Sequence, residues 1–140
     1  MKRYGLLTLA MILLAVGCQH QHIDKQEADA IVTKYIKENF KSDNRTRAAY
    51  YYNELEQERI EMSFLSGEES IIAEDAFVYY IHEGFGVSDY LSCPYRIILV
   101  SKKNGEYTVF QRAASPYVHP QGEWDNWTLL YMFANGQFWN

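Results

Sequence analysis

Proline, cysteine and linker-type sequence are scarce in this chain of 140 residues. It has three prolines and two cysteines, and it contains no Gly/Ser-rich linker, no low-complexity tract and no internal repeat. Aromatic residues, by contrast, make up 16% of the sequence and include twelve tyrosines. Few prolines and many aromatic residues are typical of a globular protein and not of a disordered one. The length suits one domain with a modest core.

The sequence also lacks the short motifs that mark common enzyme classes. It contains no Gly-x-Ser-x-Gly, no phosphate-binding loop and no dinucleotide-binding glycine pattern. Gly84-Phe85-Gly86 indicates a turn and not a phosphate-binding loop, because no Lys-Ser/Thr follows it. The acidic pairs Glu68-Glu69 and Glu74-Asp75 lie in apparent turns and are typical of a solvated surface. We therefore expect no catalytic residue and no cofactor, and an enzyme is the less favoured class.

The first eighteen residues carry the clearest signal in the chain. Lys2 and Arg3 provide a positive start, an apolar run follows over residues 6–16, and small residues lead to Cys18. This order is typical of an export signal. The apolar run is shorter than the roughly 20 residues that a membrane-spanning helix needs. Export followed by cleavage is therefore the expectation.

The last five residues of this signal, Leu-Ala-Val-Gly-Cys at 14–18, resemble the lipobox of bacterial lipoproteins. The resemblance implies that residues 1–17 are removed and that the Cys18 thiol carries a diacylglyceryl group. A third acyl chain, commonly palmitate, usually follows on the new N-terminus. Two or three acyl chains on one residue would hold the protein on a membrane. A plain signal peptide with a chance cysteine is the alternative.

The mature chain would be an acidic lipoprotein of the cell envelope. Loss of Lys2 and Arg3 leaves eighteen acidic and eleven basic residues. The net charge of about −7 argues against nucleic acid, and against docking on anionic lipid through the domain itself. Residues 18–23 would form the lipidated cysteine and a tether, and 24–140 a single domain. By resemblance to sorting in enteric bacteria, Gln19 favours the outer membrane over the inner, and the leaflet stays open.

Cys93 has no intrachain disulfide partner if Cys18 carries lipid. Its simplest role is that of a small buried residue beside a strand. Cys93 and His119 are also the one conceivable thiol–imidazole pair, with Asn126 as a third group. Pro94 follows the cysteine where thiol enzymes use a helix N-terminus to lower the thiol pKa. A small Cys/His hydrolase is therefore a minor hypothesis.

Hydrophobic periodicity predicts one helix near the N-terminus of the mature chain, over about 24–40. Asp24 suits an N-cap and Glu27 completes a capping-box pattern. Apolar residues then recur at three- and four-residue spacing, which gives one apolar stripe. Lys37 and Lys41 lie near the C-terminal end, where the helix dipole favours positive charge.

Short runs rich in β-formers, bounded by turn residues, predict strands in the rest of the chain. Asn104-Gly105 indicates a hairpin turn, and Asn135-Gly136 could return the last strand on itself. Two segments, 48–58 and 127–134, suit either a strand or a helix, and residues 114–126 are expected to be a loop. The predicted strands are 60–64, 76–81, 95–100 and 107–111.

This order of elements predicts the α+β class. We expect one N-terminal amphipathic helix packed on an antiparallel sheet of about four to five strands. The element order and the hairpin over residues 95–111 resemble cystatin-like domains, including the PepSY-type domains of exported bacterial proteins. The resemblance implies a fold and no site, because the cystatin inhibitory Gln-Val-Val-Ala-Gly loop is missing from the sequence.

The four histidines do not follow a metal-binding pattern. His20 and His22 lie in the tether, with no carboxylate or cysteine in register. His82 follows a predicted strand, and His119 lies in the loop with two prolines. A metal site needs several converging ligands with supporting hydrogen bonds. We expect no metal.

Aromatic residues are concentrated at the C-terminus, and all three tryptophans lie within residues 124–139. Exposed aromatic side chains stack on sugars or anchor protein interfaces, whereas in a small domain they more often close the core. Both interpretations stay open. Loops carry function more often than core elements do, so the expected partner-binding residues are Tyr117, His119, Trp124 and Trp127.

Three functional hypotheses follow. The first is a non-enzymatic, membrane-tethered envelope lipoprotein that binds another protein, with an inhibitor or an immunity-type protein as analogies from fold alone. The second is an accessory glycan-binding lipoprotein that uses the C-terminal aromatic residues. The third is the Cys/His hydrolase.

Overall fold

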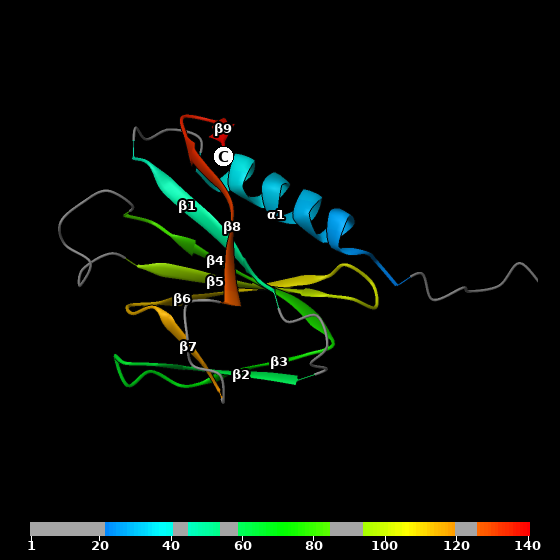
Figure 1. Cartoon of the computed structure of the whole chain (residues 1–140), viewed down its shortest axis with the longest axis vertical. Helices are drawn as coiled ribbons and strands as arrows, with labels where there is room; N and C mark the ends of the chain where they lie inside the picture. Colours follow the sequence, from blue (N-terminus) through cyan, green and yellow to red (C-terminus); the bar gives the residue numbers. More distant parts are fainter. Residues whose placement is uncertain (1–21, 41–44, 54–58, 85–93, 120–125) are drawn as a thin grey trace, which may run out of the picture.

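The computed structural model describes residues 22–40, 45–53, 59–84, 94–119 and 126–140, with the backbone alone for Tyr117 and His119. Within these ranges the chain forms one helix and nine strands (Figure 1). These elements are α1 (Lys25–Asn39), β1 (Arg47–Tyr52), β2 (Arg59–Phe64), β3 (Ile71–Glu74), β4 (Ala76–His82), β5 (Tyr95–Ser101), β6 (Tyr107–Arg112), β7 (Pro116–His119), β8 (Trp127–Ala134) and β9 (Gln137–Trp139).

The helix α1 begins where the capping pattern predicts. The Asp24 carboxylate accepts a hydrogen bond from the Glu27 N–H at 2.8 Å, and the Glu27 carboxylate accepts one from the Asp24 N–H at 3.0 Å. Two N–H groups that a helix start leaves without partners are thereby satisfied. The helix ends at Asn39, with Phe40 as its C-cap. The predicted helix is confirmed to within one residue at each end.

The strands form two antiparallel sheets. The six-stranded sheet has the order β6-β5-β4-β1-β8-β9, and the three-stranded sheet has the order β3-β2-β7. The predicted α+β class, one amphipathic helix packed on a sheet of about four to five strands, is therefore wrong. Over the residues that are described, the protein is mainly β, with nine strands in two sheets and one short helix.

The second sheet consists of β2 and two strands, β3 and β7, that the sequence does not predict. β3 has four residues and ends at Glu74, the first residue of an acidic pair that is typical of a turn. β7 begins at a proline inside the expected loop 114–126. β3 and β7 each pair with β2, which lies between them. Asp75, with φ +46°, then turns the chain from β3 into β4 of the larger sheet. The expectation of a continuous loop over 114–126 is wrong for this reason.

The larger sheet is the middle layer of the molecule, because the side chains of its strands alternate between two cores. On β4, Tyr79 and Ile81 belong to the core that includes α1, whereas Val78 and Tyr80 belong to the core that includes the small sheet. Figure 1 shows α1 on one side of this sheet and β2, β3 and β7 on the other. Both ambiguous segments contain strands, β1 in 48–58 and β8 at 127–134.

Candidate functional site: a groove between the two sheets

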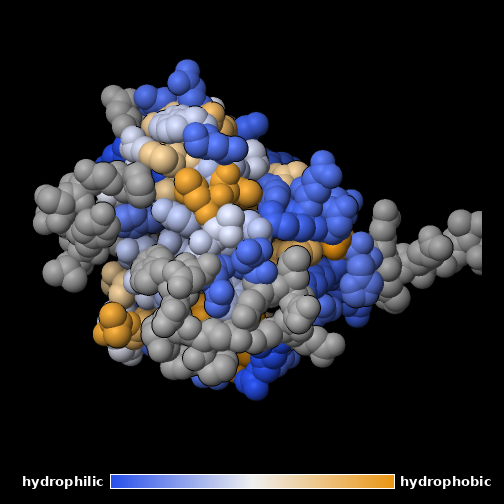
Figure 2. Space-filling view, in the orientation of Figure 1, coloured by the Kyte–Doolittle hydropathy of each residue, from blue (hydrophilic) through white to orange (hydrophobic). Residues whose placement is uncertain are grey.

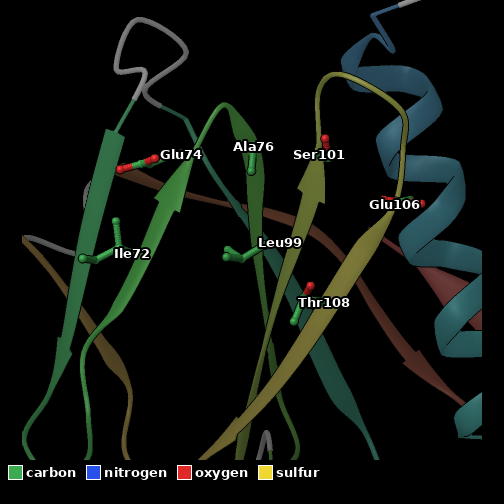
Figure 3. A pocket seen from close by; sticks show the side chains of 7 residues that line it. All are labelled: Ile72, Glu74, Ala76, Leu99, Ser101, Glu106 and Thr108. Carbon is green, nitrogen blue, oxygen red and sulfur yellow. The ribbon is translucent and has the colours of Figure 1, made fainter.

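A groove of about 560 Å³ opens beside β3, the edge strand of the small sheet, over the face of the larger sheet. Its described lining comes from the edge strand β3 on one side and from β4, β5 and β6 on the other (Figure 3). Figure 3 shows Leu99 in the space between β3 and β6. The lining residues are Ile72, Glu74, Ala76, Leu99, Ser101, Glu106 and Thr108.

The strand register explains why these side chains share one surface. Leu99 of β5 pairs with Thr108 of β6, and neighbouring strands place paired residues on the same face. Ala76 of β4 pairs with Ser101 of β5 in the same way. The four residues lie on the face that the small sheet covers elsewhere, since Leu99 packs against the core formed with that sheet. The groove is thus an uncovered part of an inner face.

The charged groups that line the groove are acidic. Glu74 and Glu106 are both exposed, and no Lys, Arg or His occurs among the seven described lining residues. Arg59 approaches Glu74 at 3.4 Å, with both side chains more than half exposed. Such an exposed ion pair contributes little to stability. Arg59 and Glu74, with His22 and Asp75, line a second hollow of about 600 Å³ that adjoins the groove at Glu74.

The described N-terminus of the chain is fixed beside the same end of the molecule. The Ile23 N–H donates to the carbonyl of Lys102, in the β5–β6 hairpin, at 2.8 Å. Gly105 in that hairpin has φ +71°, and a Cβ built there would lie 3.2 Å from Ile31 and 3.5 Å from Ile23. Glycine is therefore needed for both the turn and the close packing. The predicted Asn-Gly turn is confirmed.

The face under α1 carries polar groups that hold the helix in place. The Tyr79 hydroxyl donates to the Asp29 carboxylate at 2.7 Å, and Thr33 and Tyr131 share a hydrogen bond of 2.9 Å. Burial raises the pKa of Tyr79 above its ordinary value, and the Asp29 carboxylate adds to this effect. Burial likewise raises the pKa of Tyr131 to about 12. These hydroxyls therefore stay protonated in the folded protein and act as structural donors.

Arg96 forms a second polar contact at the C-terminal end of the helix. Its guanidinium donates to the Glu83 carboxylate and, at 2.8 Å, to the Tyr35 hydroxyl. The guanidinium also lies 4.5 Å from the centre of the Phe40 ring, within the range of a cation–π interaction. These contacts raise the pKa of Arg96 against the opposing effect of burial.

His82 lies in the core. Its ring is 6% exposed and stacks on Tyr95, with 4.8 Å between ring centres. Burial lowers the pKa of His82 below its ordinary value. Over the described ranges, no group of three or more His, Cys, Asp or Glu side chains is placed to hold a metal ion.

Of the residues that the sequence predicted for a partner site, Trp127 is the one whose side chain is described. Trp127 is 9% exposed and packs edge-on against Tyr52 and Tyr80, with ring centres 5.1 and 4.6 Å away. This tryptophan belongs to the core, one of the two interpretations left open for the aromatic tail. Tyr117 and His119 lie in β7 and only their backbone is described.

Several sequence predictions fall on residues outside the described ranges. They concern removal of residues 1–17, lipidation of Cys18, sorting by Gln19, partner contact by Trp124 and the role of Cys93. The groove, in turn, was not found from the sequence. Glu74 was singled out only as half of a solvated acidic pair, and Leu99 and Thr108 only as strand residues. No sequence signal places β3 opposite β6, because the two strands belong to different sheets.

Comparisons with known proteins add no family to this description. No protein-family model matches the chain, and neither the curated proteins nor the solved structures contain a significant match. Among the described residues, no helix is both long enough and apolar enough to cross a membrane. The lipoprotein and cystatin-like resemblances stay predictions from the sequence.

Proposed function

We propose that this protein is an exported lipoprotein, anchored to a membrane through Cys18, whose domain binds another protein in the groove between its sheets. The outer membrane is favoured over the inner one by Gln19. The proposed role is non-enzymatic, and the inhibitor or immunity-type subclass stays an analogy from fold. No observation on the described residues favours the glycan-binding or the hydrolase hypothesis over this one.

The groove is the observation that carries the proposal. Its volume of about 560 Å³ lies within the range of ligand-binding clefts. It combines aliphatic side chains, such as Leu99 and Ile72, with a rim of carboxylates and hydroxyls. An apolar floor with a polar rim is the usual composition of a protein-binding surface.

The first described residues of the chain and the groove lie toward the same end of the domain. Ile23 is hydrogen-bonded to the β5–β6 hairpin, and Ser101 and Glu106 of the groove flank that hairpin. Four residues lie between Cys18 and Ile23, so five residue-to-residue steps join them. An extended chain spans at most about 3.3–3.6 Å per step, or roughly 17 Å in all. A lipid on Cys18 would therefore keep this end of the groove close to the membrane surface.

Mass spectrometry of the purified mature protein tests the anchor. We expect a chain that begins at Cys18 and carries the added mass of two or three acyl chains. Cys18→Ala should release the protein from the membrane fraction, because the acyl chains supply the binding free energy. A native protein with an unmodified thiol at position 18, or with residues 1–17 retained, would contradict the membrane part of the proposal.

Site-specific photo-crosslinking in living cells tests the groove. A photoreactive amino acid replaces Thr108, which is exposed and lines the groove. The matched control carries the same amino acid at Glu38, an exposed residue of α1 on the other side of the larger sheet. We expect one discrete adduct from position 108 and none from position 38. The same adducts from both positions, or none from 108, would show that the groove is not the binding site.

A further inference from the structure

We propose that the groove binds an extended, basic segment of the partner protein, which adds as a strand to the outer edge of β3. This inference rests on the proposed function, since it assigns a chemistry to the occupant of the same groove. It combines three features of the described residues: an open strand edge, a lining whose charges are all negative, and exposed aliphatic side chains between those charges.

The open edge belongs to β3. In the described part of the chain this strand pairs with β2 alone, whereas β2 pairs on both sides. Figure 3 shows the groove on the side of β3 that faces away from β2. The backbone N–H and C=O groups on such an edge can pair with an extended peptide, which is a common mode of peptide recognition. Because β3 has four residues, the added ladder is short and side-chain contacts must supply the rest of the affinity.

The charges of the groove select a cationic side chain. Glu74 on β3 and Glu106 beside β6 approach it from opposite walls, and its described lining contains no basic residue. Arg59 is paired with Glu74 only through an exposed contact, which a basic side chain of a partner could replace at small cost. Complementary charge of this kind steers association and rejects acidic partners.

The aliphatic side chains select the residues between the basic ones. Ile72 on β3 is 46% exposed although it is a large hydrophobic residue, and Leu99 is only partly buried. Successive side chains of an added strand point to opposite faces. Ile72 and Glu74 lie two residues apart on β3 and therefore share its exposed face. A segment that alternates basic and aliphatic residues would place its basic side chains beside Glu74 on that face and its aliphatic side chains toward Leu99 on the other.

Nuclear magnetic resonance on the isotope-labelled, lipidated chain in detergent tests this proposal. The probe is a short synthetic peptide that alternates lysine and valine. We expect shifts of the Ile72, Glu74 and Thr108 amides and slower hydrogen exchange along β3. Removing one carboxylate by Glu106→Gln should weaken binding about fivefold, the upper range for an exposed ion pair. Glu38→Gln, at an exposed residue of α1 on the other side of the larger sheet, should leave binding unchanged.

Two further peptides separate strand addition from general attraction between opposite charges. A lysine–valine peptide N-methylated at alternate residues keeps its charge but cannot pair along one edge, so it should not slow exchange in β3. A glutamate–valine peptide should not bind. Equal binding of the methylated peptide overturns strand addition, and equal binding of the acidic peptide overturns the charge assignment.

The remaining outcomes distinguish this inference from the proposed function. If Thr108 crosslinks to a partner but no lysine–valine peptide binds, the inference is wrong and the proposed function stands. If the β3 amides shift with protein concentration alone, the occupant is a second copy of this chain and the inference is again wrong. Peptide binding without any crosslink from Thr108 in cells supports the chemistry of the groove and contradicts the proposed partner.

Discussion

The two faces of the six-stranded sheet are covered to different extents. On one face lies α1, whose fifteen residues span about 22 Å at 1.5 Å per residue. On the other, the edge strand β3 has four residues and spans about 13 Å. The helix thus extends further along its face, called the closed face below, than β3 does along the other. The face under the small sheet is left open near β5 and β6, where the groove lies.

The two faces share aromatic packing, and polar contacts add to it under α1. Under α1, hydroxyl and carboxylate groups at the margin of the core tie the helix to the sheet, as in the bond from Tyr79 to Asp29. Aromatic rings pack on both faces: Phe40 meets Phe133 at 5.5 Å under α1, and Tyr50 stacks on Tyr80 at 4.7 Å under the small sheet. The faces therefore differ in the accessibility of the groove and not in how their cores are packed. Substitutions on the closed face should change the free energy of unfolding, and substitutions in the groove should mainly change binding.

The largest expected effect comes from truncating a core residue on the closed face. Phe133 is 1% exposed and packs against Phe40 with 5.5 Å between ring centres. Phe133→Ala should lower the free energy of unfolding by about 3–5 kcal/mol, through lost burial and the cavity that is left. Urea denaturation followed by circular dichroism measures the loss. If this variant does not fold, Phe133→Leu should show a smaller loss in the same direction.

Leu99 on the floor of the groove is the matched comparison. Because its side chain is only partly buried, Leu99→Ala should cost about 1 kcal/mol, well below the value for a fully buried leucine. Similar losses at Leu99 and Phe133 would mean that the groove is packed as tightly as the helix-covered core, and the contrast between the two faces would fail.

An effect smaller than that at Phe133 is expected from removing one hydroxyl under the helix. Tyr79→Phe keeps the ring and deletes the hydrogen bond to Asp29, so it should cost about 1.5 kcal/mol. The raised pKa of Tyr79 gives a second signature. Since the folded state keeps this proton longer than the unfolded state, stability is lost as the pH rises above about 10, and Tyr79→Phe should flatten that loss. Tyr107→Phe, an exposed control, should change neither measurement.

The sequence predicted the elements that depend on local patterns. The helix followed from Asp24 and Glu27, and the β5–β6 hairpin from Asn104-Gly105 with alternating neighbours. The predicted return of the last strand after Asn135-Gly136 is also confirmed, since Phe138 pairs with Phe133. These signals act over three or four residues, so a single sequence contains them in full.

What the sequence missed depends on contacts between distant segments. β3 and β7 are short and carry an acidic pair or a proline, so their own residues do not indicate strands. They form because β2 pairs with both: Ile60 with Ala73, and Met62 with Val118. The groove depends on the same pairing, since it exists only where this small sheet ends. Neither its position nor its residues could be read from local sequence patterns.

The helix cap is expected to have a more modest effect than the buried groups. Asp24→Ala removes the carboxylate that accepts from the Glu27 N–H, which should cost about 1 kcal/mol. Thermal unfolding followed by circular dichroism measures it, with Glu38→Ala near the other end of α1 as control. The groove lies on the opposite face, so peptide binding should not change. A loss of binding in Asp24→Ala would show that the two faces are coupled.

The smallest expected effect is a pH dependence that arises under the small sheet. Burial lowers the pKa of His82, so between its folded value and the ordinary value near 6.5 the unfolded state holds more protons than the folded state. Stability should therefore fall as the pH drops below about 6.5. His82→Phe keeps an aromatic ring against Tyr95 and removes the titrating group. Melting temperatures measured from neutral to mildly acidic pH should fall less for His82→Phe than for the parent protein. The control His22→Gln, a substitution at an exposed residue, should show the same fall as the parent protein. If the melting temperature of His82→Phe falls with pH as steeply as that of the parent protein, other groups cause the pH dependence. His82 would then contribute packing alone.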